Sequence, residues 1–196
     1  MPSGTRATEE QVSAIVSIAA SLFAERGYRG TSMRDIGRAV GVHAGSLYVH
    51  IDSKEDLLYA IVTSIMQRSE RDMAEVLADG QSATEQLREI ARRDLELIGT
   101  NKEFATVFFH EWRNLGPVRQ QQVIASRDRW ENGLRTVISR GIEVGEFRRV
   151  DVRIVGIALT SMLNWAYVWY SPDGDLSVDD LAGQFAGLLI DGLHAR

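Results

Sequence analysis

The sequence predicts an all-α protein in which a small N-terminal three-helix domain, a helix-turn-helix, precedes a larger helical domain. Apolar residues recur at three- and four-residue spacing along most of the chain, and no segment alternates as a strand would. Glycines and capping residues divide this pattern into about nine or ten helices. Of the 196 residues, 44% are apolar and 25% are charged, which suffices for a core and excludes a disordered chain. The absence of cysteine excludes thiol catalysis, zinc ribbons and disulfide frameworks.

Local start and stop signals set the boundaries in the first third of the chain. Gly27 ends the first helix and Gly41 ends the second. Ser32 begins the second helix, with Asp35 three residues later as its capping-box partner, and Ser53 begins the fourth. The predicted helices cover about residues 12–26, 32–40, 44–50, 53–73, 82–98, 101–115, 117–143, 151–170 and 177–193.

Similar signals set the later boundaries. Gly99 is expected to end the fifth helix, and Pro117 suits the first turn of the long seventh helix. A loop is expected around Gly145. Asp151 and Ser177 then cap the last two helices.

The first domain, residues 1–56, has the pattern of a helix-turn-helix. Met33 and Ile36 lie on the apolar face of its second helix, and Leu47 lies on the core side of the third. Residues 26–54 carry five basic and two acidic side chains, a net charge of +3 in a chain of net charge −5. Small and polar residues remain on or near the outward face of the third helix, namely His43, Ala44, Gly45, Ser46, Tyr48 and His50. A basic patch beside a helix that begins with small residues is typical of binding in the DNA major groove.

Residues 27–57 resemble the DNA-binding domain of TetR-family transcriptional regulators. The matching residues are Gly27-Tyr28, Thr31, Ile36, Gly41-Val42, Gly45-Ser-Leu-Tyr48, His50 and Ser53-Lys-Glu-Asp-Leu57. The chain departs from the family's usual residues at Gly37, His43 and Ile51. The departure at His43 makes the operator sequence less predictable, whereas the other two are packing changes.

The resemblance implies that Thr31, Tyr48 and Lys54 hold DNA phosphates. It places four residues at the start of the third helix nearest the base edges, namely His43, Ala44, Gly45 and Ser46, with Arg34 at the flank. His50 lies on the same outward face by its spacing. The residues alone leave alternatives open. Tyr48 could be a core aromatic, and Lys54 could be a solvated first-turn charge.

The second domain, residues 57–196, concentrates the aromatic side chains, because ten of the fifteen lie between residues 104 and 170. Buried indoles need hydrogen-bond partners, which suits a cavity for a small molecule. The candidate cavity residues are Phe104, Phe108, Trp112, Trp130, Asn164, Trp165 and Trp169, with Arg113 and Arg127 at a cationic mouth. The alternatives are a plain aromatic core and a solvated arginine face paired with Glu111, Asp128 and Glu131.

Two stretches, Gly145-Glu-Phe147 and residues 164–174, resemble the C-terminal domain of a TetR subgroup. That subgroup includes acyl-CoA-responsive repressors of fatty-acid and steroid catabolism. The resemblance implies an acyl-CoA effector whose phosphates meet the arginines and whose acyl group lies inside. The alternative is a multidrug or antibiotic-efflux regulator of the same family, which would carry a buried carboxylate, such as Glu111, facing the aromatics.

The last two predicted helices suggest a homodimer, with the candidate interface residues on the final helix. Its small and apolar residues fall at three- and four-residue steps, with a pair of glycines four apart that lets helices approach closely. The candidate interface residues are Leu181, Gly183, Phe185, Gly187 and Leu188. A palindromic operator requires a two-fold dimer, and in the resembled family the last two helices build a four-helix interface. Packing within one subunit is the alternative.

Neither an enzyme nor a metal site is expected, and no cofactor is implied. The four histidines lack metal-ligand spacing, and no P-loop, nucleophile elbow or carboxylate pair occurs. Residues 154–172 are uncharged, but Thr160, Ser161 and Asn164 favour a helix buried on all sides in a cytoplasmic protein over a membrane span. A helical binding or chaperone-like module without DNA binding is disfavoured by the basic patch.

Overall fold

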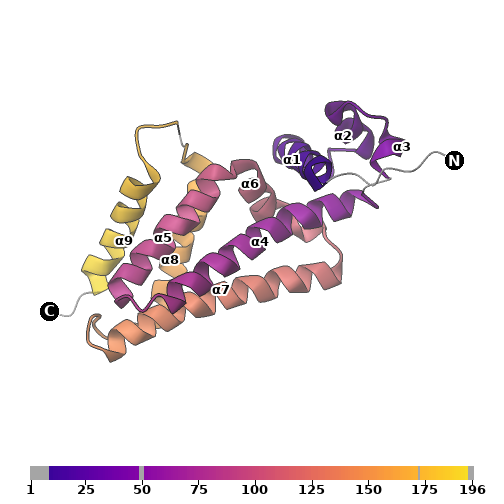
Figure 1. The fold of residues 1–196 in the computed structure, drawn as a ribbon. Helices are drawn as coiled ribbons and strands as arrows, with labels where there is room; N and C mark the ends of the chain where they lie inside the picture. The colour runs from indigo at the N-terminus through magenta and orange to yellow at the C-terminus, as the bar shows by residue number, and fades with distance from the viewer. Residues whose placement is uncertain (1–8, 49–50, 172, 194–196) are drawn as a thin grey trace. The chain divides into compact units, whose positions relative to one another are not determined.

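The computed structural model describes residues 9–48, 51–171 and 173–193 (Figure 1). All regular elements in these ranges are helices, so the all-α prediction is confirmed. The α-helices are α1 Glu9–Arg26, α2 Met33–Val40, α3 Ala44–Leu47, α4 Lys54–Ala78, α5 Ala83–Thr100, α6 Lys102–His110, α7 Pro117–Glu143, α8 Val152–Trp169 and α9 Val178–Leu193, with a 3-10 turn over Trp112–Asn114.

The predicted capping residues act as expected. The Ser32 side chain accepts a hydrogen bond from the backbone N–H of Asp35, whose carboxylate accepts one from the backbone of Ser32. Gly41 follows α2 with φ of 83°, a left-handed conformation that favours glycine. The Asp151 carboxylate accepts from the backbone N–H groups of Arg153 and Ile154 at the start of α8.

Several predicted boundaries are wrong: α1 begins at Glu9, α3 ends at Leu47 and α4 continues to Ala78. Two further differences have a local cause. Helix α5 continues through Gly99 to Thr100, because Gly99 does not take the left-handed conformation that ends a helix. Helix α6 ends at His110 instead of near residue 115. There the Glu111 carbonyl accepts from the backbone N–H of Asn114 at 2.9 Å and from its side-chain amide at 3.1 Å, which produces a 3-10 turn.

By its backbone contacts the chain forms two compact units, to which α4 and α7 both contribute residues. Unit 1 comprises Met1–Ile65 and Glu103–Val123, and unit 2 comprises Met66–Lys102 and Ile124–Arg196. In unit 1, α2 packs against α1 and α3. The functional boundary between residues 56 and 57 stays a prediction.

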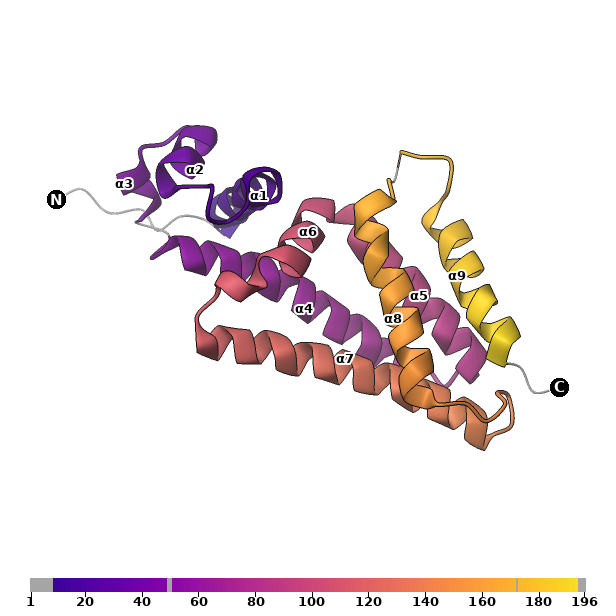
Figure 2. The same ribbon diagram turned by 180° about the vertical axis from the view of Figure 1, so that it is seen from behind.

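Unit 2 is built around α5, which packs against α8 and α9, and these two helices also contact each other (Figure 1 and Figure 2). Its core includes the fully buried side chains of Leu95, Leu134, Ile138, Leu159 and Leu163. The burial of these aliphatic side chains is the main stabilising contribution to the unit.

The loop between α7 and α8 is fixed from both sides. A Cβ atom on Gly141 would lie 2.2 Å from the ring of Phe147, so this ring packs directly on the α7 backbone. The neighbouring Glu146 carboxylate accepts hydrogen bonds from the backbone N–H groups of Ala83 and Thr84, the first residues of α5. Burial alone would raise the pKa of Glu146. The backbone hydrogen bonds oppose this effect and contribute to a pKa that is lowered overall.

Helix α8 is not buried on all sides, contrary to the sequence prediction. One side is buried through Leu159, Leu163 and Ala166, while the other exposes a row of large apolar side chains: Ile154, Ile157, Trp165, Val168 and Trp169. Of the helices described, α8 is the one whose length and composition would suit a membrane span, but single apolar helices of soluble proteins pass the same test. The exposed row therefore needs an explanation other than a membrane.

Candidate DNA-binding and effector sites

Unit 1 presents several of the predicted DNA-binding residues at its surface. Arg34 on α2 and His43 before α3 are exposed, and Tyr48 after α3 is 53% exposed. Tyr48 is therefore not the core aromatic that the sequence left as an alternative. Gly45 is also exposed, and a Cβ atom added to it would meet no other atom within 4 Å. Packing within the protein therefore does not require glycine at this position of α3.

Thr31 differs from the prediction of an outward-facing phosphate ligand. It is 2% exposed, and its hydroxyl lies 3.0 Å from the carbonyl of Gly27 and 3.3 Å from that of Leu22. These hydrogen bonds hold the side chain against the end of α1 and the loop that leads to α2. Its burial follows from this bonding, which the family pattern alone does not reveal.

Lys54, at the start of α4, is hydrogen-bonded to the same loop between α1 and α2. Its Nζ donates hydrogen bonds to the carbonyls of Tyr28 and Thr31, each at 2.8 Å, and lies 4.1 Å from the centre of the Tyr28 ring. Partial burial lowers the pKa of the ammonium, and the nearby Glu111 carboxylate opposes that shift. Lys54 is thus more than the solvated charge that the sequence left as an alternative.

Three other predicted DNA contacts involve side chains outside the described part of the structure. The backbones of Ala44 and Ser46 lie in α3, but their side chains are outside the described part, and His50 lies outside the described residues. Their contacts with DNA stay predictions.

The candidate effector residues are divided between the two units. Unit 1 contains Phe104, which is half-buried, together with the buried Phe108 and Trp112. Arg113 is exposed, and its guanidinium lies 4.8 Å from the centre of the Trp112 ring. This stacking is a cation–π contact.

The remaining candidates belong to unit 2. Arg127, Trp130 and Asn164 are half-buried, whereas Trp165 and Trp169 are 61% and 45% exposed. The exposed indoles are part of the surface row on α8, and the Trp169 ring also packs edge-on to that of Phe185.

Trp130 lines a narrow, partly open cavity within unit 2, between residues of α4, α5 and α7. The apolar lining comes from Met73, Val76, Ile90 and Leu97, and the volume of the cavity is about 10 Å³. That is about the space that one water molecule occupies.

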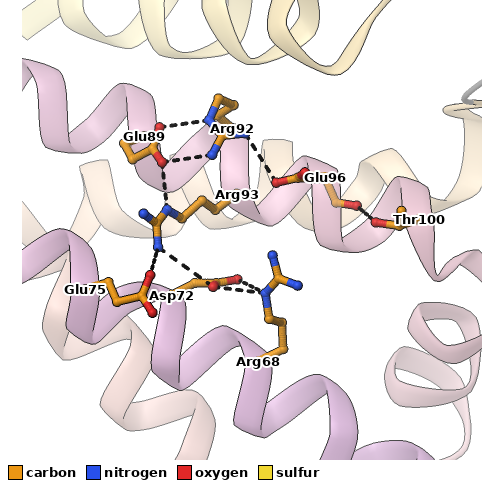
Figure 3. Close-up of polar contacts among 8 residues, drawn as sticks. All are labelled: Arg68, Asp72, Glu75, Glu89, Arg92, Arg93, Glu96 and Thr100. Carbon is orange, nitrogen blue, oxygen red and sulfur yellow. Dashed lines mark hydrogen bonds and ion pairs between the residues drawn. The ribbon is translucent and has the colours of Figure 1, made fainter.

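Charged residues beside this cavity form a network between α4 and α5 (Figure 3). The Arg68 guanidinium donates to both carboxylate oxygens of Asp72, at 2.7 and 2.9 Å. Arg93 reaches Glu89 at 2.7 Å and Glu75 at 2.5 Å. Hydrogen bonds from Arg92 and Arg93 lower the pKa of Glu89 to about 2.

Asp94 lines the same cavity but stays out of this network. Its Oδ2 atom is fully buried and has no hydrogen-bond partner. Burial, with a smaller contribution from the charge of Asp72, raises the pKa of the Asp94 carboxyl to about 7. Sequence reasoning missed this residue, although a signal existed, because Asp94 stands between Ile90 and Leu97 in the apolar row of α5.

The predicted dimer residues on α9 face in different directions. Leu181 is 2% exposed and packs into the core of unit 2, so it offers no surface to a partner. Leu188 is 70% exposed, Gly183 is exposed, and Phe185 and Gly187 are half-buried. The sequence did not separate the inward from the outward side because both sides of α9 are apolar.

Comparison with known families decides the class. Residues 15–61 match the model of the bacterial regulatory proteins of the tetR family, and residues 80–193 match that of the tetracyclin repressor-like C-terminal domain. The chain belongs to the TetR family of transcriptional regulators. The resemblance seen in the sequence is thereby confirmed, and members of this family are generally not enzymes.

Individual TetR-family relatives cover nearly the whole chain. The transcriptional repressor KstR2 of Rhodococcus jostii is 30% identical over 185 residues, which cover 91% of this chain and 89% of that protein. The solved structure of PfmR from Thermus thermophilus has a TM-score of 0.85 at 34% identity, covering 92% and 99% of the two chains. AibR, solved in complex with isovaleryl coenzyme A and operator DNA, has a TM-score of 0.82 at 29% identity, covering 92% and 98%.

Proposed function

We propose that this TetR-family protein is a cytoplasmic repressor that binds a palindromic operator as a homodimer and is released by an acyl-CoA thioester. The observation that carries DNA binding is the segregation of charge. Residues 26–54 have a net charge of +3, which leaves −8 for the rest of a chain of net charge −5. Phosphate binding needs such a local excess of basic residues, whatever the overall charge.

The surface of unit 1 supports this interface. Tyr48 is exposed where a phosphate contact is expected, and Arg34 and His43 flank the same helix. Because Gly45 has open space around it, the approach of a DNA backbone or base edge is the reason we infer for glycine there.

The exposed row on α8 supports the dimer. Ile154, Ile157, Trp165 and Val168 fall at intervals of three, eight and three residues on one side of the helix, and Leu188 is exposed on the neighbouring α9. Exposed aromatic and aliphatic side chains in a contiguous patch are characteristic of protein interfaces. A second copy of the same chain is the partner we infer, because a two-fold dimer matches two operator half-sites.

The effector class is carried over from relatives. AibR was solved with isovaleryl coenzyme A and operator DNA, and this chain shares its fold at 29% identity. The effector would release DNA by binding more tightly to the state in which the two DNA-binding units cannot reach both half-sites.

A DNA-binding experiment tests the first part. Purified protein is titrated against palindromic fragments from its own promoter region, and we expect an affinity that falls steeply with salt. Gly45→Ala should weaken binding by about tenfold while leaving the fold intact, since the methyl group meets nothing inside the protein. Asp128→Asn, at an exposed position on α7 outside the basic segment, is the control and should bind as the wild type. Salt-insensitive binding, or none to any palindrome, would refute the proposal.

A release experiment tests the effector. Isovaleryl-CoA and hexanoyl-CoA are titrated into the protein–DNA complex, and their free acids are titrated in parallel. We expect a thioester to release the DNA and the free acids not to release it. Equal release by the free acid, or release by an organic cation such as tetraphenylphosphonium, would instead favour the multidrug alternative.

A further inference from the structure

The cavity beside Trp130 combines an apolar lining with one unsatisfied polar atom. Met73, Val76, Ile90 and Leu97 supply apolar walls, while Oδ2 of Asp94 is buried among them without a partner. A buried polar atom without a hydrogen bond destabilises a protein, so its retention needs a reason.

The other charged groups of the lining, Asp72 and Arg93, are already engaged. Asp72 accepts two hydrogen bonds from Arg68, and Arg93 pairs with Glu75 and Glu89. The remaining polar side chains are those of Ser69, whose hydroxyl can serve as donor or acceptor, and Trp130, whose indole N–H can only donate. Among the charged groups that line this cavity, Asp94 alone has no hydrogen bond or ion pair.

The size of the cavity limits what can pair with Asp94. A volume of about 10 Å³ admits a single oxygen-sized group. A hydroxyl has this size, and it can donate to an ionised carboxylate or accept from a protonated one. A methylene group would also fit but would leave Oδ2 unpaired. A second cation is disfavoured, because the Arg93 guanidinium lines the same cavity.

We propose that Asp94 selects effectors whose acyl group carries a hydroxyl, which enters this cavity and exchanges a hydrogen bond with the Asp94 carboxyl. The inference rests on the proposed response to acyl-CoA thioesters and narrows its effector class. Only the hydroxyl enters the pocket that Trp130 helps to line, and the rest of the acyl chain, the thioester and the nucleotide remain outside.

The test compares thioesters of equal chain length. Hexanoyl-CoA, 3-hydroxyhexanoyl-CoA and 6-hydroxyhexanoyl-CoA are titrated into the complex of full-length protein with operator DNA. For the wild type we expect one hydroxylated thioester to release DNA at a concentration at least about tenfold lower than hexanoyl-CoA does. Three variants accompany it: Asp94→Leu, Asp94→Asn and the exposed control Asp128→Leu.

Each variant has a distinct expected result. Asp94→Leu should respond equally to plain and hydroxylated thioesters and should remain responsive to hexanoyl-CoA. Asp94→Asn, which still forms hydrogen bonds, should keep most of the preference, and Asp128→Leu should keep all of it. Circular dichroism verifies that each variant is folded before its release curve is interpreted.

The failures are distinguishable. Equal potency of all three thioesters on the wild type would overturn the role of Asp94 and leave the acyl-CoA response standing. A preference that survives in Asp94→Leu would place the selection elsewhere and also overturn the inference. If no thioester releases DNA, the proposed function itself fails and the inference with it.

Discussion

The unpaired carboxyl of Asp94 makes a quantitative prediction about stability. Its pKa is raised from 3.8 to about 7, first by burial and then by the charge of Asp72. Between these two values the folded protein binds more protons than the unfolded chain, so the free energy of unfolding falls as the pH rises from about 4 to about 7. Below that window the burial of the neutral acid carries no such penalty, and above it the full penalty applies.

The magnitude follows from the size of the shift. About three pKa units at 1.36 kcal/mol each give a loss of about 4 kcal/mol above pH 7. Asp94→Asn keeps the shape of the side chain and removes the titrating group. The variant should therefore be more stable than the wild type at about pH 8. The difference in free energy of unfolding between the two proteins should be larger at about pH 8 than at about pH 5 by about 2–3 kcal/mol.

Equilibrium urea unfolding, followed by circular dichroism at one protein concentration, measures the difference at both pH values. Titration of the groups that do not interact with Asp94 is common to both proteins and cancels in the comparison. The exposed Asp128→Asn is the matched control and should show a difference that does not change with pH. An Asp94→Asn difference that is equally independent of pH, or a variant that is less stable at the higher pH, would refute the reasoning.

Three further predictions follow from contacts elsewhere. Lys54→Met should lower the free energy of unfolding by about 1–3 kcal/mol, since two backbone carbonyls lose their donor, and an unchanged urea midpoint without DNA would contradict this bracing role. Gly141→Ala should cost about 1–3 kcal/mol because its methyl group would overlap the Phe147 ring, whereas Gly192→Ala should be neutral or stabilising; equal urea midpoints for the two would count against the packing argument. Trp165→Glu should yield monomers in sedimentation experiments, and a dimer of undiminished affinity would exclude the α8 row from the interface.

Local signals predicted the first part of the fold well. The Ser32–Asp35 capping box and the left-handed Gly41 depend on residues that are close in sequence, so the pattern alone suffices to place α2. Gly99 carried the same kind of signal but continues a helix, and its backbone does not take the left-handed conformation that Gly41 has.

The candidate sites were less predictable because they depend on which side of a helix faces the core. Leu181 and Leu188 are both leucines on α9, yet one is buried and the other is exposed. Thr31 matched a family position, but its burial became visible only with the carbonyls that its hydroxyl contacts. Asp94 could not be predicted as a site residue, because a single acidic residue in an apolar row resembles ordinary surface variation unless the cavity beside it is known.

The unequal burial of the four tryptophans has a spectroscopic consequence. Trp112 is 8% exposed, Trp130 is half-buried, and Trp165 and Trp169 are 61% and 45% exposed. Emission from the isolated chain is thus a sum of short- and long-wavelength components from indoles with different surroundings. If α8 pairs with a second copy, dilution below the dissociation constant of the dimer shifts the emission of Trp165 and Trp169. An effector near the cavity instead changes the emission of Trp130. Replacing Trp165 and Trp169 with phenylalanine would leave an optical reporter of the interior, and replacing Trp130 would leave a reporter of assembly.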